Sequence, residues 1–115
     1  MKKENFWIYM LECSNGNFYT GYTNDLDKRL FEHSNGTIKS KFTRSFKPVR
    51  LAQCWKIHDA KGTALRIESF IKKQKREIKE EFILNPLLLI GVLLDDERYD
   101  VATMEVEPVE GYDVL

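Results

Sequence analysis

The fold is decided by residues 6–23, which read FWIYMLECSNGNFYTGYT. Both ends of this stretch are rich in aromatic and apolar residues of the kind found in strands, and the middle is the turn-forming run SNGN. The stretch therefore predicts a β-hairpin, with one strand over residues 6–13 and its partner over residues 18–23.

The length of the turn decides which side chains share a face. A two-residue turn would place Tyr9 and Tyr19 on opposite faces, because side chains alternate along a strand. A three-residue loop over residues 14–16, with Gly16 in the left-handed conformation, brings both tyrosines to one face and sets Gly21 beside Tyr9. We predict the three-residue loop. Two strand tyrosines alone indicate only core packing.

The rest of the chain predicts an α+β order of β-β-α-β-α-α. The elements expected after the hairpin are a helix from an Asn24 cap to about Ser34, a strand over 49–57, and helices over 60–74 and 76–84. We expect residues 1–84 to form one domain and residues 85–115 to form an extension. The structure of this extension does not follow from its pattern.

Composition points to a globular protein in a reducing compartment. The chain has 115 residues, of which 43% are apolar and 31% charged. Cys13 and Cys54 both fall in apolar runs, which favours buried free thiols. The apolar run over residues 87–94 is too short for a membrane span of ~20 residues and suits a core helix or strand. With no signal-like N-terminal pattern, we expect a cytoplasmic protein with no membrane contact.

A net charge of zero hides a separation of charge along the sequence. Residues 1–80 hold 17 Lys and Arg against 9 Asp and Glu, whereas residues 81–115 hold one Arg against 9 acidic residues. A basic body suits a polyanion such as nucleic acid. The acidic end is expected either to fold over the basic face and compete with DNA or to form a solvated, partly disordered tail. Its spaced valines and Met104 indicate an apolar contact, with its own body or with a second chain.

Glu68 lies inside the apolar arc of its expected helix. At about 100° per residue, this arc is formed by Ala64, Leu65, Ile67, Phe70 and Ile71. A carboxylate on an apolar face loses hydration unless it is paired or bound to a metal. Two interpretations stay open: an ion pair with Lys72, four residues on, or a ligand of a hard divalent cation such as Mg²⁺.

Arg29 and His33 lie four residues apart and therefore share one stripe of their helix. A guanidinium group matches a phosphate, and an imidazole can carry a proton or donate to a phosphate oxygen. A solvated helix edge, with Arg29 paired to Asp25, explains the same spacing. The pair gains meaning only if the fold brings it to the tyrosines and to Glu68.

Two basic runs suit a nucleic-acid backbone. The first interleaves cations with Phe42 and Phe46, as expected for phosphate contacts with some base stacking. Its candidate contact residues are Lys39, Lys41, Phe42, Arg44 and Lys47. The second run ends the Glu68 helix and contributes Lys72 and Lys73. A solvated loop and an ordinary helix end explain these runs equally well.

Taken in order, these pieces resemble the GIY-YIG endonuclease family, in particular its small single-domain bacterial members. The motifs that carry the resemblance are Trp7-Ile8-Tyr9, the tract from Tyr19-Thr20-Gly21 to Leu30, His33-Ser34-Asn35-Gly36, Lys41-Phe42-Thr43-Arg44 and Arg66-Ile67-Glu68. The similarity covers residues 6–84. It implies a small three-stranded antiparallel sheet flanked by helices.

The resemblance also implies a reaction and a role for each site residue. Glu68 would bind one Mg²⁺ or Mn²⁺ ion, and Arg29 would stabilise charge on the phosphate in the transition state. Tyr9 would activate the attacking water, with Tyr19 positioning it. Because the pKa of a free tyrosine is near 10, this role needs Arg29 or the metal to favour the phenolate. His33 would assist at the phosphate or orient a tyrosine.

The expected function is a metal-dependent DNA endonuclease, with a possible place in DNA repair or recombination. The sequence contains no recognisable DNA-reading module, so selectivity for DNA structure rather than base sequence is expected. Two alternatives stay open: a nucleic-acid-binding domain with little or no nuclease activity, and a partner-binding protein that uses the fold as a scaffold.

Overall fold

The computed structural model describes residues 2–35, 45–99 and 101–110. Its elements are β1 (Glu4–Cys13), β2 (Phe18–Thr23), α1 (Leu26–Asn35), β3 (Pro48–Asp59), α3 (Lys61–Lys72), α4 (Arg76–Leu84), α5 (Leu87–Leu94) and β4 (Glu105–Val106). The expected order is confirmed through α4, with boundaries within two residues of the prediction, and the apolar run 87–94 is a helix. No helix in the described part of the chain is long and apolar enough to cross a membrane.

The β1–β2 hairpin has the three-residue loop that the sequence predicts. The Cys13 N–H donates to the Asn17 carbonyl at 2.9 Å, and Gly16 has a φ of 82°. This loop sets the register so that Tyr9 pairs with Gly21. Tyr9 and Tyr19 consequently point to the same face of the sheet.

The sheet is antiparallel with the strand order β2-β1-β3-β4. It has four strands rather than the three expected. The fourth strand comes from the extension, where Val106 pairs with Trp55 and Glu105 pairs with Lys56 of β3. A two-residue strand leaves no alternating pattern long enough to recognise in a sequence, which explains why it was missed.

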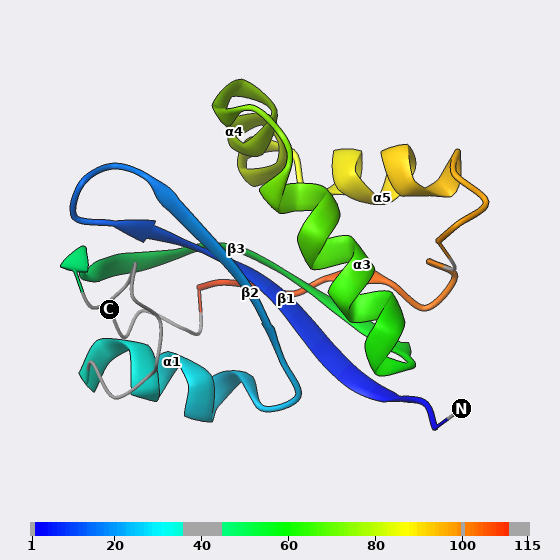
Figure 1. The fold of residues 1–115 in the computed structure, drawn as a ribbon, viewed down its shortest axis with the longest axis horizontal. Helices are drawn as coiled ribbons and strands as arrows, with labels where there is room; N and C mark the ends of the chain where they lie inside the picture. Colours follow the sequence, from blue (N-terminus) through cyan, green and yellow to red (C-terminus); the bar gives the residue numbers. More distant parts are fainter. Residues whose placement is uncertain (1, 36–44, 100, 111–115) are drawn as a thin grey trace.

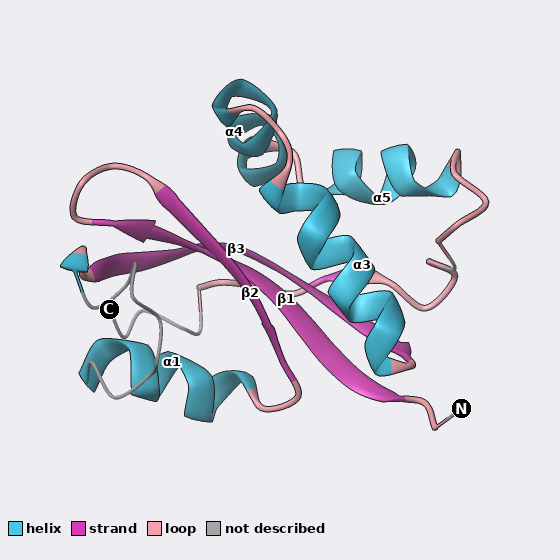
Figure 2. Ribbon diagram, viewed as in Figure 1, coloured by secondary structure: helices cyan, strands magenta, loops and turns pink. Residues whose placement is uncertain are grey.

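The two faces of the sheet are covered by different helices, as Figures 1 and 2 show. Helix α1 lies on one face, and α3, α4 and α5 lie on the other. Because side chains alternate along β1, this strand contributes residues to the cores on both faces of the sheet. Its positions Phe6, Ile8 and Met10 enter the cluster under α3, while Tyr9 and Leu11 enter the cluster under α1.

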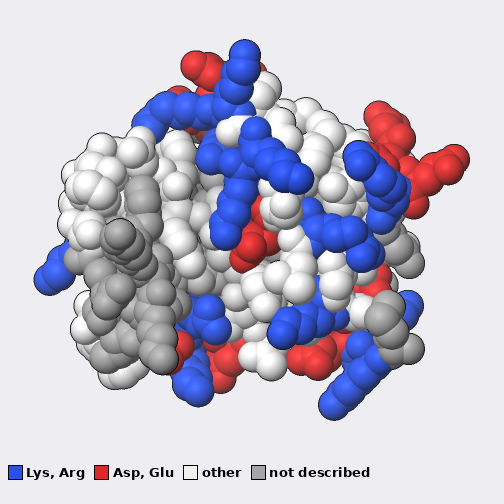
Figure 3. All heavy atoms as spheres, viewed as in Figure 1, with Lys and Arg blue, Asp and Glu red and all other residues white. Residues whose placement is uncertain are grey.

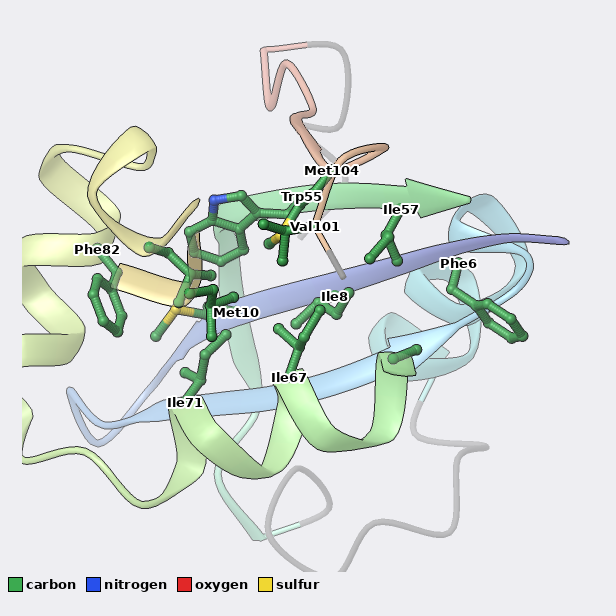
Figure 4. Packing of buried hydrophobic residues seen from close by; sticks show 13 residues of the cluster. Phe6, Ile8, Met10, Trp55, Ile57, Ile67, Ile71, Phe82, Val101 and Met104 are labelled. Atoms are coloured by element: carbon green, nitrogen blue, oxygen red, sulfur yellow. The ribbon is translucent and has the colours of Figure 1, made fainter. Parts of the chain in front are cut away.

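The larger core lies between the sheet and α3. Figure 4 shows side chains of the strands and of α3 pointing toward one another, with Trp55 among them. Trp55 is fully buried, and its indole N–H donates to the Pro86 carbonyl at 2.9 Å. The strand tryptophan therefore anchors the start of α5.

The extension packs on the body of the protein. Val101 and Met104 are buried in the larger core, and Val109 packs against the smaller cluster under α1. The Thr103 hydroxyl and the Glu107 N–H also bond to carbonyls of β3. The interpretation of this segment as a solvated tail is wrong for residues 101–109, because its spaced apolar side chains find places on the chain's own core. Val114 lies outside the described residues.

Helix α1 begins one residue later than predicted, and Asp25 rather than Asn24 caps it. The Lys28 N–H donates to the Asp25 carboxylate at 3.2 Å. The Asn24 amide instead donates to Glu4 on β1 at 3.3 Å. Both residues suit a cap by type. The turn after β2 decides between them, because the Thr23 hydroxyl bonds to the Asp25 N–H.

Candidate active site

The face of the sheet under α1 brings three of the predicted site residues into direct contact. The Tyr9 hydroxyl lies 2.9 Å from His33 Nε2. The His33 ring meets the Tyr9 ring edge-on at 5.6 Å and the Tyr19 ring at 5.2 Å between centroids. Neighbouring strands of the sheet and the last turn of α1 thus converge on one point.

Gly21 makes this convergence possible. A Cβ atom at residue 21 would lie 2.5 Å from the Tyr9 hydroxyl oxygen and 2.6 Å from the ring carbon that carries it. Real Cβ atoms do not approach other atoms so closely, so the Tyr9 ring fills the space that a side chain would take. The prediction that Gly21 leaves room beside Tyr9 is confirmed.

Burial and neighbouring charges set the protonation states of Tyr9 and His33. Tyr9 is fully buried, and burial together with the nearby Tyr19 raises its pKa well above the usual value. Arg29 opposes this increase through its charge and a hydrogen bond to the phenol. Burial, helped by Arg29, lowers the pKa of His33 from 6.5 to about 4. At neutral pH the pair is therefore a protonated phenol beside a neutral imidazole.

The second ring nitrogen of His33 adds a constraint. Nδ1 is buried and has no hydrogen-bond partner among the residues that the structure describes. A neutral imidazole carries one N–H and one lone pair. The 2.9 Å contact with Tyr9 is compatible with either tautomer.

Arg29 lies at the rim of this cluster. It forms an ion pair with Glu32 at 3.5 Å, and both side chains are about one third exposed, at 35% and 33%. The expected alternative pairing with Asp25 is wrong, because Asp25 caps the helix instead. A long, partly exposed ion pair is weak. An incoming phosphate can therefore compete with Glu32 for the guanidinium group.

Glu68 belongs to α3, and its charge also acts on Tyr9. It raises the pKa of Tyr9, the smallest of five influences on that group. The Glu68 side chain is 14% exposed and forms an ion pair with Lys72, with 3.2 Å between Oε1 and Nζ. Leu65, expected on the apolar arc beside it, is 41% exposed. Glu68 therefore lies at the border between the core and solvent, where a carboxylate keeps access to an ion.

The chemistry of this carboxylate fits a lightly held magnesium-type ion. Within residues 2–35, 45–99 and 101–110, no three His, Cys, Asp or Glu side chains are grouped to hold a metal. A Mg²⁺ ion commonly uses one or two carboxylates and completes its shell with water and phosphate. Glu68 offers such a single hard oxygen donor at a partly open border.

The sequence did not indicate one further cation near this site. A cavity of about 300 Å³ is lined by Arg29 together with Lys61, Asn24 and Glu4. Lys61 is the first residue of α3, more than thirty positions from Arg29 in the chain. No local pattern marks it, because its place beside Arg29 depends on how α3 crosses the sheet.

The predicted nucleic-acid contacts fall into two groups. Lys39, Lys41, Phe42 and Arg44 lie outside the described residues. Lys47, Lys72 and Lys73 are exposed. Figure 3 shows Lys and Arg atoms spread over α3 and the start of α4, around a small acidic area near the centre of this face. Further acidic atoms lie beyond the end of α5.

Both cysteines have the environment expected for structural thiols. Cys13 and Cys54 are buried and free. Burial raises the pKa of both thiols, so they remain protonated at neutral pH. Neither has the electropositive, accessible surroundings of a reactive cysteine.

The fold and this cluster define a member of a nuclease superfamily. Residues 5–81 match the GIY-YIG catalytic domain. The chain therefore belongs to the GIY-YIG family, whose nucleases generally use divalent metal ions. The matched region contains Tyr9, Tyr19, Arg29, His33 and Glu68, and the whole extension lies beyond it.

Within the family, the chain is similar to bacterial UPF0213 proteins. It is 39% identical over 83 residues to a UPF0213 protein of Bacillus cereus, covering 72% of this chain and 84% of that protein. It is also 39% identical over 77 residues to one of Syntrophus aciditrophicus, covering 67% and 87%. The solution NMR structure of UPF0213 protein BH0048 from Bacillus halodurans is 34% identical, covers 77% of this chain and 96% of that chain, and has a TM-score of 0.42.

Proposed function

We propose that this protein is a divalent-metal-dependent DNA endonuclease that hydrolyses phosphodiester bonds. One observation carries the proposal. The Tyr9 hydroxyl contacts His33 at 2.9 Å and feels the charges of both Arg29 and Glu68. A buried tyrosine hydroxyl that contacts a histidine and lies within the electrostatic influence of a phosphate-type cation and a metal-type carboxylate is more than core packing requires.

Glu68 is the residue that would hold the metal, Mg²⁺ or Mn²⁺. When bound, such an ion polarises a phosphoryl oxygen and stabilises the leaving oxygen. Lys72 now holds one Glu68 oxygen at 3.2 Å and is itself half exposed, at 49%. A half-exposed lysine can turn away at little cost, because surface ion pairs contribute little stability.

Arg29 binds the scissile phosphate. Its partner Glu32 is a weak competitor at 3.5 Å, whereas a guanidinium group matches phosphate with two parallel hydrogen bonds. Arg29 then stabilises the charge that develops on the phosphate oxygens.

Tyr9 and His33 move the proton of the attacking water. The phenol stays protonated in the free protein because burial raises its pKa. In the tautomer with the proton on Nδ1, neutral His33 accepts the Tyr9 proton at Nε2 while Tyr9 takes one from water. Tyr19, half-buried and packed on the same imidazole, positions the water.

The substrate is DNA chosen by structure rather than by base sequence. The cations of the α3 face contact phosphates, which carry no sequence information. Action on damaged or branched DNA, in repair or recombination in the cytoplasm, fits this mode of binding.

The test compares Glu68→Gln with Glu80→Gln on supercoiled plasmid and on branched DNA in Mg²⁺ or Mn²⁺. Both residues pair with a cation four residues away in the chain, Glu68 with Lys72 and Glu80 with Arg76. We expect Glu68→Gln to lower the cleavage rate by about 100-fold or more and Glu80→Gln to leave it unchanged. Equal rates for the two variants would disprove the metal role of Glu68. DNA binding without cleavage by the unsubstituted protein would favour the binding-domain alternative.

A further inference from the structure

A second cleft lies on the outward side of α3, next to the segment that follows α5. Its volume is about 350 Å³, and it is lined by Arg66, Ser69, Phe70, Lys73, Arg98 and Tyr99. Arg66, Ser69 and Phe70 belong to α3, and Lys73 is its C-terminal cap residue. Arg98 and Tyr99 belong to the extension. Arg98 and Tyr99 lie beyond the matched family region, which ends at residue 81.

The cations of this cleft leave it with a net positive charge. Arg98 is held by Asp96, with 2.6 Å between guanidinium nitrogen and carboxylate oxygen, so its charge is balanced. Arg66 and Lys73 have no carboxylate within ion-pair distance among the described residues. Within the described part of the chain, the hydrogen bond of the Arg66 side chain goes to the Thr63 hydroxyl, at 3.2 Å. Two uncompensated cations favour an anionic ligand.

The same cleft also presents planar groups, namely two aromatic rings and a guanidinium group. Tyr99 meets Phe70 edge-on with 5.9 Å between ring centroids, and the Arg98 guanidinium lies 5.8 Å from the Tyr99 ring centroid. Both rings are half-buried, so each keeps an exposed part. Aromatic rings and guanidinium planes are surfaces on which nucleic-acid bases stack.

The cleft lies within a short reach of the candidate metal carboxylate. Glu68 and Lys73 are five residues apart near the end of one helix, which corresponds to a rise of about 7.5 Å along the axis and a turn of about 140° around it. The axial rise alone corresponds to about two nucleotides of a DNA strand, at about 3.4 Å each. A strand held at Glu68 can continue into the cleft over the outward surface of α3.

We propose that this cleft binds an unpaired nucleotide of single-stranded DNA adjacent to the cleavage site. Arg66 and Lys73 take the phosphate, and Tyr99 with Arg98 takes the base. A duplex hides its bases in the stack, so a cleft with both rings and cations selects a strand that is already open. The choice of DNA rests on the proposed function; the cleft and its chemistry do not.

The test measures binding without catalysis, in EDTA, by fluorescence anisotropy. Labelled probes are a 12-nucleotide single strand, a blunt duplex and a duplex with a single-stranded flap. The variant Arg66→Ala/Lys73→Ala is compared with Lys2→Ala/Lys3→Ala, which removes the same charge from two exposed residues at the start of the chain. We expect the first variant to weaken single-strand and flap binding about tenfold and duplex binding less than threefold. Equal losses for all three probes, or equal losses in the two variants, would overturn the proposal.

A second readout addresses the base. A single strand carrying 2-aminopurine loses fluorescence when that base stacks, and we expect Tyr99→Leu to abolish this quenching while thermal unfolding shows a folded protein. Quenching that persists in Tyr99→Leu would show that the base does not stack on the Tyr99 ring. Competition by a free deoxynucleoside monophosphate at micromolar concentration would show that the cleft takes a free nucleotide and not a strand. Because no cleavage is measured, these outcomes are independent of whether the protein is a nuclease.

Discussion

The two faces of the sheet share one strand and differ in what that strand gives them. Toward α3, β1 presents Phe6, Ile8 and Met10 to a core of apolar side chains. Toward α1, it presents Tyr9 to a smaller cluster, and Tyr9 there meets the polar groups of His33 and Arg29. Alternation along a single strand thus separates an apolar layer from a layer with titratable groups.

This division shows how a small domain can hold a buried, unfavourable pair of polar groups. Desolvation shifts the pKa of Tyr9 upward and that of His33 downward, and each shift reflects a cost of keeping the charged form buried. The free-energy cost of burying Tyr9 and His33 arises on the face under α1, which has the smaller core. The face under α3 supplies most of the apolar burial, and Glu68 lies at its border with solvent.

The largest effect on stability is expected at Trp55. The Trp55→Ala substitution removes a fully buried side chain and its hydrogen bond to Pro86. We expect it to lower the free energy of unfolding by about 3–5 kcal/mol, measured by urea denaturation. The control Leu94→Ala changes a leucine that is 65% exposed and should stay within about 0.5 kcal/mol. A loss below about 1.5 kcal/mol at Trp55 would show that the α3 face does not dominate stability.

A smaller effect on stability and a large effect on the site are expected at Gly21. The Gly21→Ala substitution places a methyl group 2.5 Å from the Tyr9 hydroxyl oxygen, so the Tyr9 ring must leave His33. We expect cleavage to fall by about 100-fold, with an unfolding cost of about 1–3 kcal/mol. Gly91→Ala is the matched control, because its methyl group would enter open space and should stabilise α5 slightly. Full activity in Gly21→Ala would separate the Tyr9–His33 contact from catalysis.

The third effect is the pH dependence caused by His33, which appears only in acid. The unfolded chain protonates this residue below its ordinary pKa of 6.5, whereas the folded protein resists protonation down to about 4. Stability should therefore fall as the pH decreases from about 6.5 to 4, by about 3 kcal/mol at most. His33→Gln should flatten this part of the profile of unfolding free energy against pH. The exposed His58 provides the control variant, His58→Gln, and identical profiles for both variants would disprove the assignment.

The sequence predicted the parts of this protein that depend on neighbouring residues. The hairpin register follows from the three loop residues and the alternation of side chains, and it places Tyr9 opposite Gly21 as observed. The helices and their order follow from apolar periodicity. One failure depends on a contact between distant segments, because β4 joins β3 as a fourth strand. The other is local: Arg29 pairs with Glu32 rather than Asp25, whose carboxylate caps the helix.

The candidate site shows the same limit. Its residue types could be chosen from the sequence, and Glu68 was found because a carboxylate interrupts an apolar arc. The contact between Tyr9 and His33, 24 positions apart, exists only after α1 packs on the sheet. The burial of Tyr9 was not predicted either, because it depends on how closely Tyr19, His33 and Arg29 cover the hydroxyl.

The three-residue turn between β1 and β2 has a consequence for how this gene can change over generations. Hairpin loops usually tolerate insertions and deletions well. Here, the loss of one residue would rotate every side chain of β2 to the opposite layer and carry Tyr19 into the apolar core. Ser14 and Asn15 can be replaced by other residues. Gly16, with its φ of 82°, can be replaced by asparagine at some cost in stability. Selection therefore has to maintain the three-residue length of this loop rather than its sequence.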